Sequence, residues 1–110
     1  MADLTRVRLQ VEELAHYLNR NEVPDVVDEF RQLGQHMDSL EQNAAMVQLE
    51  GPESVAGHAQ DAIMISANAC RALVEWKAYP GESRQQETAA YVQEMYKVAS
   101  RFEKTARKHL

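Results

Sequence analysis

Apolar residues recur with a helical period along most of this chain. From residue 26 to residue 47 their spacing alternates between four and three positions: Val26, Phe30, Leu33, Met37, Leu40, Ala44 and Val47. Such positions line one side of an α-helix, whereas a strand would repeat every second residue. The pattern therefore predicts a long amphipathic helix that lies against other helices.

Three further segments carry helical patterns, and short breaks with Gly or Pro separate them. Gly51 suits the end of one helix, and Pro24 suits the first turn of another. Ser83 and Gln86 match a capping box at the start of the last helix. The predicted helices cover about residues 3–20, 24–49, 53–78 and 83–108. Short connections predict an all-α, antiparallel four-helix bundle with one domain over residues 1–110.

Two local features qualify this prediction. Val7, Leu9 and Val11 alternate with polar residues, which is also typical of a short strand. The chain from Glu12 onward continues as a good helix, so we expect helix throughout this segment. Gly34 lies inside the second helix, where it costs about 1 kcal/mol relative to Ala. We expect a neighbouring helix to approach closely there.

The third segment is apolar around most of its circumference between residues 59 and 76, which is typical of a buried helix. A strip of small residues would let another backbone approach. We assign self-association to that side of the helix, through Ala59, Ala62, Ser66, Ala69 and Leu73. The excess apolar surface favours a homodimer, since two-fold pairing is the commonest form of oligomer. The alternative is a compact monomer in which the first and last helices wrap the third.

Charge narrows the classes of partner. The chain has 12 Lys and Arg residues against 17 Asp and Glu residues, for a net charge of −5. This balance disfavours direct binding to nucleic acid or to an anionic membrane. A single cysteine, no basic and apolar leader, and no apolar run of about 20 residues predict a cytoplasmic protein.

The second helix concentrates the negative charge. We expect its acidic face to bind a basic surface of a partner protein through Asp25, Asp28, Glu29, Asp38 and Glu41. The last helix carries a row of bases that would match the helix dipole and form salt links to the second helix. That row consists of Lys97, Arg101, Lys104 and Lys108.

One catalytic pattern deserves comparison. Arg31 and His36 form an R-x-x-x-x-H motif that resembles the motif of HEPN ribonucleases, which are small all-helical domains. The resemblance covers six residues and implies an RNA-cleaving dimer in which these two residues form the active pair. The acidic charge around the motif would repel RNA.

Other candidate chemistry is sparse. Glu13 and His16 have the Glu-x-x-His spacing of di-iron bundles, but they lie off the apolar side of their helix, and a di-iron site needs two such motifs. Cys70 fits a buried thiol. The chain therefore predicts neither a metal nor a cofactor.

A small-ligand sensor is the remaining alternative, with a pocket near Trp76, Tyr79 and Tyr91. The leading hypothesis is a non-enzymatic helical protein, of adaptor or inhibitor type, that binds another macromolecule.

Overall fold

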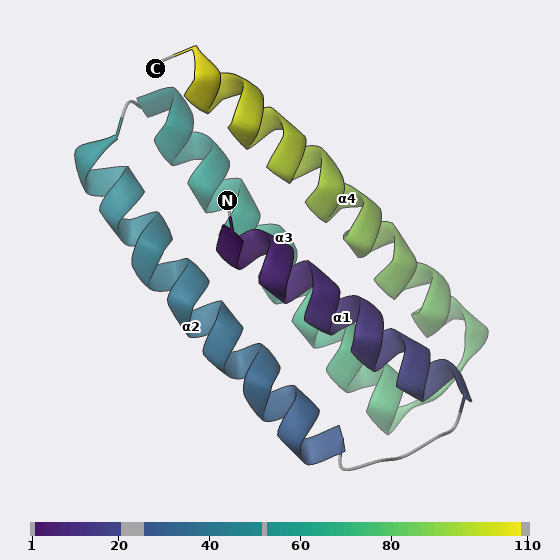
Figure 1. Ribbon diagram of the computed structural model, residues 1–110. Coiled ribbons are helices and arrows are strands. Elements are labelled where there is room, and N and C mark those ends of the chain that lie inside the picture. Colours follow the sequence, from purple (N-terminus) through teal and green to yellow (C-terminus); the bar gives the residue numbers. More distant parts are fainter. Residues whose placement is uncertain (1, 21–25, 52, 109–110) are drawn as a thin grey trace.

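The computed structural model describes residues 2–20, 26–51 and 53–108, and it contains four helices (Figure 1). They are α1 (Ala2–Arg20), α2 (Val26–Glu50), α3 (Glu53–Ala78) and α4 (Glu82–Arg107). The described ranges contain no strand, so the strand alternative for the first segment is wrong. Apart from the start of α2, the helix ends agree with the predicted ends to within one residue. The expected start of α2 at residue 24 lies outside the described residues.

The helices form an antiparallel bundle in which α1 lies in front of α3, between α2 and α4 (Figure 1). Both α1 and α3 contact all the other helices, whereas α2 and α4 lie at opposite corners and do not approach each other within the described ranges. No ion pair joins α4 to α2 within those ranges, so the predicted salt links are not formed there. Lys97 instead pairs within α4 with Glu94, at 3.2 Å.

The apolar repeat read from the sequence forms the core. On α2, Leu33, Leu40 and Ala44 are buried, and Phe30 and Met37 are partly buried against them. The other helices contribute fully buried side chains that include Leu4, Val7, Val11, Leu14, Leu73 and Met95. Burial of a large apolar side chain stabilises the fold by about 1.5–3 kcal/mol, so this layer holds the four helices together.

Polar contacts at the edge of the core tie α1 to α2. Gln10 donates a hydrogen bond to Glu29 at 2.5 Å, and Asn43 donates one to Asp3. Each contact includes a buried side chain, Gln10 in the first and Asp3 in the second, which makes it worth more than a fully exposed one. The α1 side of α2 is therefore occupied within the chain.

The five residues assigned to self-association are all inside the single chain. Each of them is 0% exposed: Ala59, Ala62, Ser66, Ala69 and Leu73. The small side chains do permit a close approach, but the helices that use it belong to the same chain, where α1 and α3 meet across the bundle. A pairing surface made of these residues is therefore not available on the folded chain.

A glycine follows the end of α2 and another precedes the start of α4. The N–H of Gly51 donates to the carbonyl of Val47 at 2.7 Å and closes the last turn of α2. The carbonyl of Gly81 accepts from the N–H groups of Arg84 and Gln85. Gly81, rather than the predicted Ser83, is therefore the residue at the N-cap of α4.

Candidate protein-binding face

Apolar side chains that the fold leaves exposed gather where the start of α2 lies beside the end of α3. Val27 is 57% exposed and Val74 is 56% exposed. With Phe30 and Lys77 they line an open hollow of about 310 Å³ between the two helices. The ammonium nitrogen of Lys77 lies 5.4 Å from the centre of the Phe30 ring, so a cation rests against an aromatic surface.

Gly34 lies one turn after Phe30 on α2. It is exposed, and a Cβ atom placed on it would meet nothing within 4 Å. The predicted close approach of another helix is therefore wrong. The missing side chain instead leaves a gap on the outer surface of the bundle.

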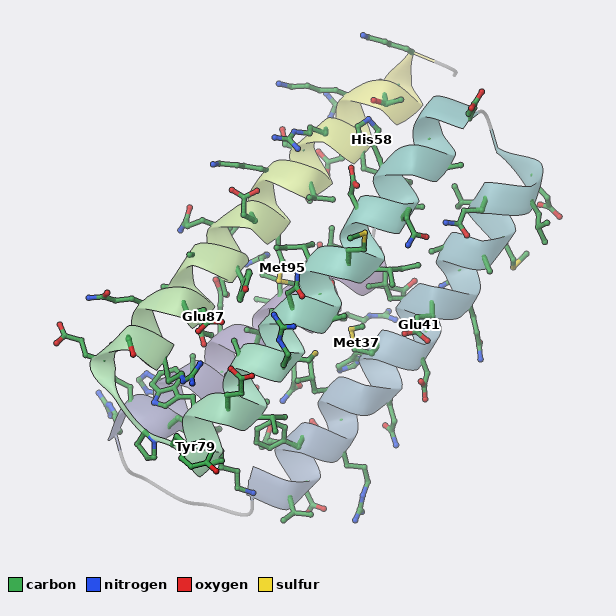
Figure 2. All side chains as sticks on the ribbon, turned by 180° about the vertical axis from the view of Figure 1, so that it is seen from behind. Met37, Glu41, His58, Tyr79, Glu87 and Met95 are labelled. Carbon is green, nitrogen blue, oxygen red and sulfur yellow. The ribbon has the colours of Figure 1, made fainter. Side chains whose placement is uncertain are left out.

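The predicted acidic face of α2 divides into two parts. Glu29 is partly buried and accepts the hydrogen bond from Gln10, so it serves the α1–α2 contact. Asp28 forms an exposed ion pair with Arg31 at 3.4 Å. Asp38 and Glu41 are exposed on the outer surface, and Glu41 lies on the α3 side of α2, one turn from Met37 (Figure 2). Asp25 lies outside the described residues.

The neighbouring side of α3 carries two exposed bases. Arg71 is exposed three residues before Val74, and Lys77 is exposed three residues after it, so the three share one side of the helix. We call the whole surface the α2–α3 face. It consists of Val27, Phe30, Gly34, Asp38 and Glu41 on α2, and of Ala67, Arg71, Val74 and Lys77 on α3.

The α3 half of this face escaped the sequence analysis. We predicted that α3 would be covered around most of its circumference, but Met64 and Val74 are each 56% exposed. The signal that was available is the position of Arg71, which marks the solvent side of the helix and so places Val74 there as well.

Arg31 and His36, the two residues of the nuclease-like motif, differ in exposure and in direction. Arg31 is exposed and its guanidinium pairs with Asp28, whereas His36 is partly buried. Positions five apart on a helix lie about 140° apart around the axis, so the two side chains leave α2 in different directions. Within one chain they do not form a joint site.

A second hollow lies between α1 and α4 and has a volume of about 280 Å³. Trp76 of α3 forms part of its apolar wall with Ala15 and Val92, and Glu12 and His16 are among its polar residues. The predicted ligand pocket near Trp76 thus corresponds to a real concavity. The tyrosines named with it do not line the hollow; Tyr79 is 74% exposed at the end of α3 (Figure 2).

Reactive side chains are few in the part of the chain that the structure describes. Burial raises the pKa of the Cys70 thiol to about 11, which keeps it protonated and unreactive at neutral pH. Glu13 accepts a hydrogen bond from the hydroxyl of Tyr17 at 3.1 Å. Within the described ranges no three His, Cys, Asp or Glu side chains are grouped so as to hold a metal ion.

Comparisons with known proteins give no match: no family model fits the chain, and no curated protein or solved structure is significantly similar to it. None of the described helices has both the length and the apolar character needed to cross a membrane.

Proposed function

We propose that this chain is a non-enzymatic interaction protein that binds another protein through the α2–α3 face. The observation that carries the proposal is the exposed apolar hollow of about 310 Å³ at Val27, Phe30 and Val74. Covering such a surface lowers the free energy by about 25 cal/mol for each Å² of apolar area. An exposed apolar surface with charged residues at its rim is typical of a protein interface.

The chemistry of the rim indicates what a partner would offer. Asp38 and Glu41 are exposed carboxylates one turn apart on α2, and neither is used in an ion pair that the structure records. A partner surface with apolar side chains and an adjacent Arg or Lys would satisfy both parts of the face. Such charges speed the encounter and fix its orientation more than they add affinity.

The test is capture from an extract of the host with the charges on α2 reversed. The Asp38→Lys/Glu41→Lys variant should lose the proteins that the unchanged chain retains, while circular dichroism stays helical. Glu103→Lys is the matched control, because Glu103 is an exposed acid on α4. Capture that survives the double reversal and is lost in the control would contradict the proposal.

A second candidate function is the binding of a small ligand in the hollow at Trp76. The supporting observation is its form, with a mostly apolar wall and several polar side chains at the rim. Screening with the fluorescence of Trp76, the chain's one tryptophan, tests it directly. A saturable change that His16→Ala weakens supports a ligand site.

A further inference from the structure

We infer that the α2–α3 face pairs with the same face of a second copy of this chain, about a two-fold axis parallel to the helices. The inference deepens the proposed function and rests on it, because it names the protein that covers this face when the chain is alone. Two-fold pairing requires a surface that complements itself.

The charges of the face provide that complement. Its α2 half presents the acids Asp38 and Glu41, and its α3 half presents the base Arg71. An axis parallel to the helices sets α2 of each copy against α3 of the other, so the acidic part of α2 faces Arg71. An axis across the helices at the level of Asp38 and Glu41 would set α2 against α2, and these acids of one copy would face those of the other. Like charges in contact cost several kcal/mol, so an arrangement centred on these acids favours the parallel axis.

Contacts within the chain fix which residues lie at one level. Gln48 of α2 donates a hydrogen bond to Gln60 of α3 at 2.8 Å, and near the other end Lys77 lies over Phe30. Because the helices are antiparallel, each step forward on α2 corresponds to a step back on α3. Asp38 is then level with Arg71 to within two residues, which is about 3 Å along the axis. Rotation about a parallel axis preserves level, so Asp38 meets Arg71 of the partner subunit.

The same register gives a packing match. Gly34 and Val74 are level to within one residue, and both lie on the exposed surface. Since space around Gly34 is open to at least 4 Å, Val74 of the partner subunit fits over the gap that the glycine leaves. A protruding side chain set against a gap between neighbouring side chains is how paired helices commonly pack.

The whole side of the bundle that α2 and α3 form is large enough for a dimer. The two helices have 25 and 26 residues, and each is therefore about 38 Å long at about 1.5 Å per residue. Two neighbouring helices, each about 10 Å wide, offer roughly 750 Å². A stable interface of standard size takes about 800 Å² from each partner.

The experiment is a charge exchange followed by sedimentation equilibrium, across micromolar to millimolar concentrations of the full chain. The unchanged chain should form a dimer, and Asp38→Arg and Arg71→Asp should each raise its dissociation constant about tenfold or more. The combined Asp38→Arg/Arg71→Asp variant should restore the affinity. Glu103→Arg, on α4, should leave the dimer intact.

Three results would overturn the inference. One is a chain that stays monomeric at every concentration, and another is a combined variant that is no tighter than the single ones. The third is a dimer that survives Val74→Glu as well as both charge reversals. If the chain is monomeric yet the Asp38→Lys/Glu41→Lys variant still loses its captured proteins, self-pairing is refuted while the proposed function stands.

Discussion

At the scale of single residues, Gly34 and Gly51 differ in the space that a side chain would have. A Cβ at Gly34 would meet nothing within 4 Å, whereas a Cβ at Gly51 would lie 2.7 Å from the carbonyl oxygen of Val47. Gly34→Ala should therefore stabilise the monomer by about 1 kcal/mol, because alanine favours helix. Gly51→Ala should destabilise it, since the backbone must shift.

Urea denaturation at a protein concentration at which sedimentation detects only the monomer measures both changes. Each variant is the control for the other, because both replace a glycine by the same residue. Loss of stability in Gly34→Ala would show that the surface there is less open than the structure indicates.

The pKa of the Cys70 thiol indicates that this side chain is buried. Its pKa rises from 9.0 to about 11 because burial disfavours the thiolate. The folded chain thus favours the protonated thiol, and the stability this group contributes is present below pH 9 and is lost as pH rises toward 11.

We therefore expect slow alkylation of Cys70 by iodoacetamide at pH 8, and rapid alkylation in denaturant. Between pH 9 and 11, the free energy of unfolding of the unchanged chain should fall relative to that of the Cys70→Ala variant. A thiol that reacts in the folded chain at the rate of a free cysteine would contradict the burial.

At the scale of helices, one polar cluster docks α1 on α4. The guanidinium of Arg8 donates to the hydroxyl of Tyr96 at 2.6 Å and to Glu12 at 3.1 Å, and it lies 4.1 Å from the centre of the Tyr96 ring. The Arg8 side chain is only 16% exposed. Contacts of this kind are worth about 1 kcal/mol each, so they fix how α1 sits on the bundle.

Arg8→Ala should accordingly lower the free energy of unfolding by about 1–2 kcal/mol. Tyr96→Phe keeps the ring and removes only the hydroxyl, so its cost should be smaller. Arg6→Ala is the matched control, because Arg6 is 63% exposed and 3.7 Å from Asp3. Thermal denaturation separates the three; equal losses in Arg6→Ala and Arg8→Ala would show that the α1–α4 cluster adds nothing.

The helices themselves were predictable because the signal is local. Apolar spacing and the break at Gly51 depend only on neighbours in sequence, and apart from the start of α2 they predicted each helix end to within one residue. The cap at Gly81 was misplaced by two residues, to Ser83, since several residues near a helix start can accept hydrogen bonds. Which side of each helix meets which neighbour was less predictable.

At the scale of the whole molecule, the arrangement of the helices decides what the sequence alone could not. The strip from Ala59 to Leu73 was correctly predicted to be covered, but by helices of the same chain rather than by a second copy. Glu29 was grouped with surface acids because periodicity does not show that Gln10 lies within reach. Arg71 and Val74 become part of one face with Asp38 only when α2 and α3 are placed side by side.

The central claim is that the α2–α3 face is covered by another chain in a defined register, and mixed disulfide cross-linking tests it most directly. In a Cys70→Ala background, one chain carries Asp38→Cys and a second carries Arg71→Cys. A disulfide needs Cα atoms within about 7 Å, so only residues brought into contact will join. The account predicts a covalent dimer from the mixture and none from either chain alone; a dimer of the Asp38→Cys chain with itself, or none in the mixture, would contradict it.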